Sequence, residues 1–286
     1  MGQLIFNGLV DGAIIALPAT AFTMLFAILR FANFSVGTFM TVGAYLALSL
    51  NVLLGAPLWL ASLGTMLATA TLFWLSDLIV YKPMRDFHSI SLLIVSIAVS
   101  LVVENIIRLF YGNDVRGFDL ALTRPIKMAG LRFTVDQLWI LAIAMTVMLA
   151  MHILLSYTKL GKAMRATADN FQLAEVRGIN TGRVIAATWL IGGALIGLSG
   201  VFAGVDLVIE PMLGWSLTIP VFAAAILGGI GSPYGAMLGA ILVGFAEEIT
   251  GQFLAPSYKV AVGFVIIAVL LMFRPQGLFG QPEIKK

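Results

Sequence analysis

The stretch "SISLLIVSIAVSLVVENIIRLF" (residues 89–110) decides the fold class of this protein. It is apolar almost throughout, and about 20 such residues are what a helix needs to cross the hydrocarbon core of a bilayer. Its apolar character is continuous, whereas the strands of a membrane barrel alternate between apolar and polar positions over roughly 10 residues. Residues 89–110 are therefore predicted to form a transmembrane α-helix.

Similar apolar windows recur along the whole chain. Of the 286 residues, 60% are hydrophobic and 11% are charged, whereas about 25% of the residues in soluble domains are charged. The windows occupy residues 4–29, 36–54, 57–80, 89–110, 136–156, 183–205, 215–230, 234–255 and 258–273. We predict an all-α fold, a polytopic membrane helix bundle with about eight or nine transmembrane helices. Residues 1–286 are expected to form one transmembrane domain.

Basic residues between the windows predict the orientation of the bundle. Lys and Arg concentrate in loops on the cytoplasmic side of membrane proteins. Here they follow the third, fifth and ninth windows, which are separated by even numbers of spans and can share one side. These residues are Lys82 and Arg85; Lys159, Lys162, Arg165, Arg177 and Arg183; and Arg274, Lys285 and Lys286. The parity predicts a periplasmic N-terminus and a cytoplasmic C-terminus, although the loop 111–135, which it places outside, also carries four basic residues.

The composition excludes several classes of chemistry. The chain has no cysteine and two histidines, so neither thiol chemistry nor a metal cluster is expected. It lacks the G-x-x-x-x-G-K-[ST] loop that cradles phosphates, and "GGIGSPYG" (228–235) is typical of a helix-breaking turn. We therefore expect no enzyme activity and no cofactor in this chain; ATP and Mg would be bound by other chains. The net charge of +3 requires no nucleic acid partner.

A polar turn interrupts the apolar sequence after the first window. The stretch "RFANFSVGTF" (30–39) places Asn33, Ser35 and Gly37 in a hydrophobic region. Non-helical backbone at membrane depth occurs where it is buried in protein or lines a cavity, and broken helices often mark transport pathways. The alternative is an ordinary short loop at the cytoplasmic surface, with Arg30 as one of its positive charges.

The fourth window carries a polar stripe. Ser96, Ser100, Glu104 and Arg108 follow one another at steps of four, which places them on one face of a helix. This face should point into the bundle or into an aqueous cavity, because a carboxylate and a guanidinium are costly against lipid. One interpretation makes the stripe part of a solute vestibule. The other is an internal Glu104–Arg108 ion pair with serines that pack as small residues.

A pair of carboxylates, Glu247 and Glu248, lies two-thirds along the eighth window. One of the two can point into the bundle, and an intramembrane carboxylate is a candidate functional residue by default. Glu247 is therefore added to the candidates for the translocation pathway. A proton relay would need more carboxylates or histidines at matching depth, which argues against a proton-coupled carrier.

The segment 157–183 is the one long polar stretch of the chain. Its residues 163–177, "AMRATADNFQLAEVR", favour helix throughout, and Gly178 would end that helix. A short helix with a sharply marked end suits a rigid body that inserts into the groove of a partner protein. The alternative is a solvated connector.

Several separated motifs resemble one family. The stretch 163–178 resembles the coupling segment of bacterial ABC importer permeases, with Ala174 and Gly178 at the family's Ala-to-Gly spacing. The wider resemblance is to the LivH type of permease, which belongs to the branched-chain amino acid branch. It is carried by "ALPATAFTMLFAILRFANFSVGTFMTVGAY" (16–45), "RGINTGRVIAATWLIGGALIGLSGVFAG" (177–204), "LGGIGSPYGAMLGAILVGFAEE" (227–248) and "FRPQGLFG" (273–280).

The chain also departs from the family pattern. The coupling signature lacks its leading Glu and its first Ala. Ser35 and Val36 stand where the family turn carries Ala-His, so this chain has no histidine at that position to fill whatever role it has in the family.

The resemblance implies a permease subunit of an importer in the bacterial inner membrane. Such a subunit pairs with a second, LivM-like permease, binds two cytoplasmic ATPase subunits and receives solute from a periplasmic binding protein. The solute would be a branched-chain amino acid or a related small polar or organic molecule. The implied ATPase-coupling residues are Arg165, Asn170, Ala174, Glu175 and Gly178.

Two other classes of function remain open at this point. An ion- or proton-coupled secondary carrier or channel would work without an ATPase and would not need a docking segment. A scaffold without transport would not need the polar stripe.

Overall fold

The computed structural model of the chain describes residues 1–119, 126–128, 131–255, 258–274 and 276–279. Lys285 and Lys286, which contributed to the predicted orientation, lie outside these ranges. The helices of the described part are α1 (Gly2–Leu29), α2 (Ser35–Leu48), α3 (Leu58–Ser76), α4 (Ser89–Tyr111), α5 (Val135–Tyr157), α6 (Lys159–Asp169), α7 (Phe171–Val176), α8 (Thr181–Asp206), α9 (Leu213–Gly228), α10 (Pro233–Phe253) and α11 (Lys259–Phe273).

Short π and 3₁₀ turns extend two of these helices. Helix α2 continues into the π-helical turn η1 (Ser49–Leu53), and α3 continues into η2 (Asp77–Tyr81) and the 3₁₀ turn η3 (Lys82–Met84). The strands β1 (Ile126–Met128) and β2 (Leu131–Phe133) form an antiparallel hairpin in which Lys127 pairs with Arg132.

Each of the nine apolar windows forms a helix, which confirms the all-α membrane bundle. Six helices of the described residues are long and apolar enough to cross a bilayer, counting the extensions of α2 and α3. They are Gly2–Leu29, Ser35–Leu53, Leu58–Met84, Ser89–Tyr111, Val135–Tyr157 and Thr181–Asp206. Helices α9 and α11 are shorter apolar helices, and α10 carries two adjacent glutamates. The total number of spans stays a prediction.

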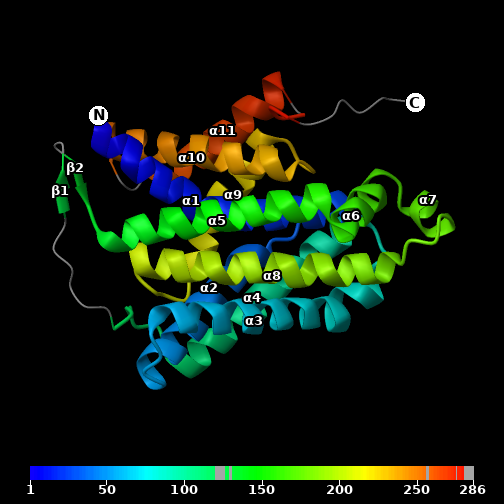
Figure 1. The fold of residues 1–286 in the computed structure, drawn as a ribbon, viewed down its shortest axis with the longest axis horizontal. Coiled ribbons are helices and arrows are strands. Elements are labelled where there is room, and N and C mark those ends of the chain that lie inside the picture. Colours follow the sequence, from blue (N-terminus) through cyan, green and yellow to red (C-terminus); the bar gives the residue numbers. More distant parts are fainter. Residues whose placement is uncertain (120–125, 129–130, 256–257, 275, 280–286) are drawn as a thin grey trace.

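The bundle has an inner and an outer group of helices (Figure 1). In the most apolar window of α1, 83% of the residues are buried, and the value is 72% for α2 and α8, against 22–28% for α3, α4 and α5. The outer helices expose leucine, isoleucine and valine, as helices that face lipid do. The inner helices pack on one another and on α9 and α10.

Glycines permit the closest helix pairs. Gly37 of α2 lies against Gly214 and Thr218 of α9, and a Cβ atom on Gly37 would collide with the Gly214 carbonyl and the Thr218 hydroxyl. Small residues let helix backbones approach in this way where no hydrophobic force drives helices out of lipid. The close packing fixes α2, and with it the turn that precedes α2, against the core of the bundle.

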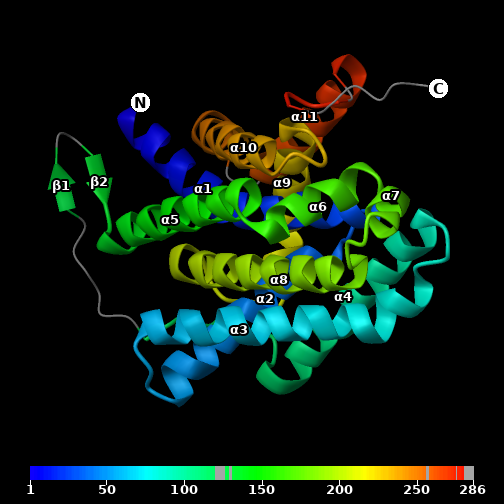
Figure 2. The ribbon, with the colours of Figure 1, turned by 45° about the vertical axis from the view of Figure 1, so that its right-hand side comes forward.

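The two ends of the bundle carry different features. The N-terminus and the β1–β2 hairpin lie at one end, and α6 and α7 lie at the other, together with the turn that joins α3 to α4 (Figures 1 and 2). We call these the hairpin end and the α7 end. The basic segments after α3 and α5 therefore share one end of the bundle.

Candidate functional site

The polar segment after α5 begins with an amphipathic helix. The Thr158 hydroxyl oxygen accepts a hydrogen bond from the Gly161 N–H at 3.0 Å and caps the N-terminus of α6. The buried residues Gly161, Met164 and Thr167 follow at steps of three on the side that faces the bundle. The basic residues of α6 are exposed on the remaining surface, as expected of a helix that lies on a protein.

The segment breaks at Asn170, so the prediction of one helix over residues 163–177 is wrong. Asn170 has extended backbone angles, φ −153° and ψ 104°, and its side-chain oxygen accepts from the Leu173 N–H at 2.9 Å. It ends α6 and at the same time caps the N-terminus of α7. Asparagine does this because its side chain competes with the helix for backbone hydrogen bonds. Asn170 could have been recognised as an N-cap from its place just before a short helix-forming run.

Helix α7 ends as the sequence predicts. Gly178 has φ +82°, its N–H donates to the Glu175 carbonyl at 2.9 Å, and the Ile179 N–H donates to the Ala174 carbonyl at 3.0 Å. These two bonds make a Schellman motif, which satisfies the last carbonyls of a helix and favours glycine. The Thr181 hydroxyl donates to the Glu175 carboxylate at 2.9 Å and ties α7 to the start of α8. Glu175 therefore braces the turn.

The side chains of α7 divide into a buried and an exposed set. Ala174 is buried, whereas Leu173 is 53% exposed and Val176 is 84% exposed. Figure 1 shows α7 at one end of the molecule, and the exposure of Leu173 and Val176 places both on the side of α7 that does not pack on the bundle. The sequence did not indicate that Leu173 and Val176 face outward. Composition alone cannot tell which face of so short a helix packs on the chain.

The turn between α1 and α2 is a true break, and it is buried. Asn33 and Ser35 are fully buried, and the Asn33 side-chain oxygen accepts from the Ser35 N–H at 3.0 Å and from the Ser35 hydroxyl at 2.6 Å. The Tyr81 hydroxyl donates to the Ser35 hydroxyl at 3.1 Å. This result contradicts the interpretation of Asn33 and Ser35 as an ordinary surface loop. Only Arg30, at the start of the turn, is exposed.

The polar stripe of α4 faces the bundle, as predicted. Ser96, Ser100 and Glu104 are buried on the side of α4 that packs on α2. The Ser96 hydroxyl accepts from the Phe34 N–H at 3.0 Å, so the stripe begins at the turn that contains Asn33. Glu104 pairs with Arg108 at 2.5 Å. The geometry is that of an ion pair with serines that pack as small residues, and a role of the stripe in transport stays a prediction.

Glu247 lies apart from these candidates. It is 6% exposed, on α10, a helix that packs on α1. Its neighbour Glu248 contacts Lys259 of α11 and accepts from the Asn7 amide at 3.1 Å, and Lys259 also lies 3.6 Å from Asp11. The sequence did not predict this network, because its members come from three helices. The structure therefore brings Asn33, Ser35 and Ser96 together at the turn between α1 and α2, with Gly37 inside α2 against α9 and Glu247 elsewhere.

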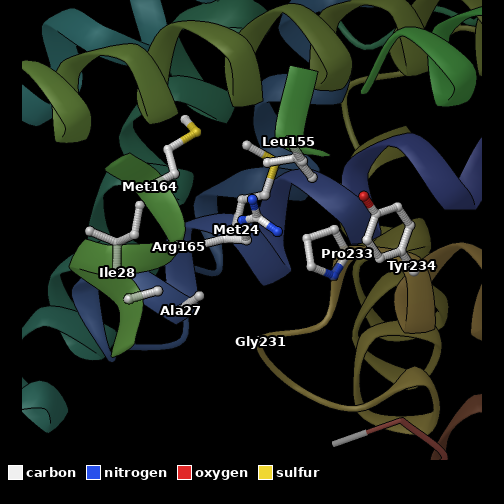
Figure 3. A pocket seen from close by; sticks show the side chains of 10 residues that line it. Met24, Ala27, Ile28, Leu155, Met164, Arg165, Gly231, Pro233 and Tyr234 are labelled. Carbon is white, nitrogen blue, oxygen red and sulfur yellow. The ribbon is translucent and has the colours of Figure 1, made fainter. Parts of the chain in front are cut away.

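A cleft opens beside α6. Met24, Ala27 and Ile28 of α1 form one wall, Met164 and Arg165 of α6 form another, and the turn between α9 and α10 closes the third side (Figure 3). The cleft has a volume of about 80 Å³ and is open to solvent. Arg165, one of the predicted coupling residues, stands in this cleft.

Comparison with known proteins places the chain in a family. Residues 4–271 match the family described as the branched-chain amino acid transport system permease component. The chain is 33% identical to the high-affinity branched-chain amino acid transport system permease protein LivH of Salmonella typhimurium, over 99% of this chain and 97% of the relative. It is 32% identical to the permease protein BraD of Pseudomonas aeruginosa, with the same coverage of both chains.

A more distant likeness extends to a solved structure. PsaBC from Streptococcus pneumoniae in complex with Fab matches with a TM-score of 0.53 and 15% identity, over 96% of this chain and 92% of that chain. At this identity the likeness shows the fold alone. The family match over nearly the whole chain is the decisive finding. The chain belongs to the permease components of branched-chain amino acid transport systems.

Proposed function

We propose that this chain is the membrane-spanning permease subunit of an ABC importer in the bacterial inner membrane. It moves a branched-chain amino acid or a related small polar solute from a periplasmic binding protein to the cytoplasm. The family match and the bundle of apolar helices support this function. The chain supplies no ATPase of its own, and ATP and Mg are bound by partner subunits.

The observation that carries the proposal is the shape of α7. The helix is capped by Asn170 at its start and closed by Gly178 at its end, and between them Leu173 and Val176 point away from the bundle. Apolar side chains on a rigid helix that projects from the molecule are typical of a helix that docks in a groove. In an ABC importer, the partner whose groove receives such a helix is the ATPase subunit.

The predicted coupling residues then have distinct roles. Asn170 and Gly178 define the ends of α7, Ala174 is its buried side and Glu175 braces the following turn. Leu173 and Val176 make the contact, and Arg165 adds a positive charge on the neighbouring helix α6. Asn170, Ala174, Glu175 and Gly178 were named as coupling residues from the sequence, without the break at Asn170, while the contacting residues come from the exposed face of α7.

The orientation and the remaining partners follow from the same assignment. The α7 end is cytoplasmic, which makes the hairpin end and the N-terminus periplasmic and the C-terminus cytoplasmic. The periplasmic binding protein then meets the hairpin end. A second, LivM-like permease completes the membrane part, and it packs on the outer helices of this bundle.

The candidates for the translocation pathway belong to two groups in this proposal. Asn33 and Ser35 form the helix break between α1 and α2, Gly37 follows in the first turn of α2, and Ser96 is bonded to the break. Ser100 and Glu104 continue that polar face toward the hairpin end, and Glu247 lies on α10.

Co-purification in mild detergent tests the proposal. The tagged chain is drawn from its own membranes, and every co-purifying protein is identified. We expect a P-loop ATPase and a second multi-span chain, and loss of the ATPase from a variant that carries Leu173→Asp and Val176→Asp. Val115→Asp is the matched control, because Val115 is 61% exposed in the loop that follows α4. Retention of the ATPase by the double variant, or recovery of the chain alone, would contradict the proposed docking.

A further inference from the structure

Arg30 has a backbone conformation that arginine rarely adopts. Its φ is +57° and its ψ is 29°, and it is the one non-glycine residue with positive φ among the described residues. The left-handed region is unfavourable for side chains with a Cβ atom and is usually given to glycine at the end of a helix. Arg30 ends α1 in this conformation, and its N–H donates to the Phe26 carbonyl at 2.9 Å. A glycine would end the helix with less strain, so the arginine side chain needs its own explanation.

The side chain of Arg30 reaches helix α6. Its guanidinium donates to the Ala168 carbonyl at 2.7 Å, although the two residues are 138 positions apart in sequence. Ala168 lies in the last turn of α6, two residues before the break at Asn170. The bond therefore joins the turn after α1 to the part of α6 that leads into α7.

The same turn is bonded to the membrane helices. Phe34 donates its N–H to Ser96 of α4, and Asn33 and Ser35 accept from the Tyr81 hydroxyl at the end of α3. Arg30 thus stands at the exposed end of a short segment whose buried end is fixed to α3 and α4.

Direct packing between α6 and α1 is incomplete at this place. The cleft described above lies between Ala27 and Ile28 of α1 and Met164 of α6 (Figure 3). Methionine side chains such as Met24 and Met164 adapt to changes in the shape of a cavity. The empty space and its adaptable walls allow α6 to shift against α1. The hydrogen bond from Arg30 to Ala168 keeps the turn after α1 connected to α6 during such a shift.

We propose that Arg30 is a positioning residue that carries movement of the docked α6–α7 unit to the helix break at Asn33. The inference rests on the proposed function, since an ATPase must move α7. When the ATPase shifts α6, Arg30 draws the turn 30–34 with it, and the change reaches α2 and α4 through Asn33 and Phe34. Arginine occupies this strained position because glycine has no side chain that could reach α6.

A reporter in the turn tests this role. The chain has no cysteine, so a single cysteine at Ala32, which is partly buried in the turn, can be followed by its rate of reaction with a maleimide. The complex co-purified with its ATPase is measured with and without ATP. We expect ATP to change the rate at least about fivefold when Arg30 is present. Arg30→Gly and Arg30→Asn tolerate the left-handed backbone but lack the reach, and both should abolish the change.

Controls separate positioning from a purely structural role. Both variants should assemble, unfold at the wild-type temperature and hydrolyse ATP within about twofold of wild type, and Arg30→Lys, which keeps a donor, should restore part of the ATP response. An unchanged response in Arg30→Asn would overturn the inference, as would a parallel fall of assembly and unfolding temperature. Absence of any ATP response with Arg30 in place, in a complex that contains the ATPase, would also overturn the inference, whereas failure of any ATPase to co-purify would contradict the proposed function itself.

Discussion

Two asparagines interrupt helices of this protein, and they do so in different surroundings. Asn33 is buried between α1 and α2, and its side-chain oxygen accepts from the Ser35 N–H and hydroxyl, with the Tyr81 hydroxyl close by at 3.3 Å. Asn170 is exposed between α6 and α7, and within the described part of the chain its side-chain oxygen accepts one hydrogen bond, from the Leu173 N–H. The protein supplies the donors for the Asn33 oxygen at the buried break, although the Asn33 amide nitrogen has no partner among the described residues, whereas polar groups at an exposed break can bond to water. The first fixes a segment in the bundle, and the second presents a segment to a partner.

The largest effect is expected from damage to the packing around the buried break. Gly37→Val should prevent folding, because its Cβ atom would collide with backbone and side-chain atoms of α9. Overpacking of this kind costs about 1–3 kcal/mol and can cost more when backbone is in the way. Thermal unfolding of the detergent-solubilised chain measures the loss. Gly182→Ala is the control, since a Cβ atom there meets only the Asn180 side chain at 3.5 Å.

Removal of the buried asparagine should have the next largest effect. Asn33→Leu leaves the Ser35 N–H and the Ser35 hydroxyl without their acceptor, which we expect to lower the free energy of unfolding by about 1–3 kcal/mol. The further change Ser35→Ala removes one of these stranded donors, and Tyr81→Phe then removes the hydroxyl that would lose Ser35 as its acceptor. The triple variant should therefore be more stable than Asn33→Leu alone, and a triple variant that is less stable would show that these bonds do not hold the break.

A smaller effect is expected at the exposed break. Asn170→Ala removes the cap of α7 and should cost about 1 kcal/mol, confined to α7 because the bundle does not depend on it. Hydrogen exchange of residues 171–176 should become faster, while exchange in α1 and α2 stays unchanged. Asn170→Asp keeps the capping oxygen and should leave both regions unaffected. Faster exchange throughout the bundle would show that the two breaks are not independent.

The smallest effect on stability is expected on the exposed face of α7. Val176→Asp changes a side chain that is 84% exposed, so the free energy of unfolding should stay within about 0.5 kcal/mol of wild type. Binding of the ATPase should nevertheless be lost, because a charge then lies in an apolar contact. A stability loss comparable with that of Asn33→Leu would mean that Val176 packs on the chain.

The sequence predicts some of these features well and others poorly. The apolar windows and the end of α7 at Gly178 depend on neighbouring residues, so the pattern along the chain predicts them. The break at Asn170 was missed because good helix formers surround it, and one side-chain cap outweighs their propensity. The bond from Arg30 to Ala168 and the contact of Glu248 with Lys259 join distant segments, so no local pattern indicates them. Nor does the sequence show that Leu173 and Val176 face outward.

ATP-dependent uptake of leucine into vesicles tests the central claim most directly. The complex co-purified with this chain is reconstituted with its binding protein, and wild type is compared with Val176→Asp and with Val176→Leu, which keeps an apolar side chain. If the exposed face of α7 couples ATP hydrolysis to transport, uptake is lost in Val176→Asp and stays at the wild-type level in Val176→Leu. Equal uptake by all three proteins would contradict the account, because α7 would then not be where the ATPase acts on the permease.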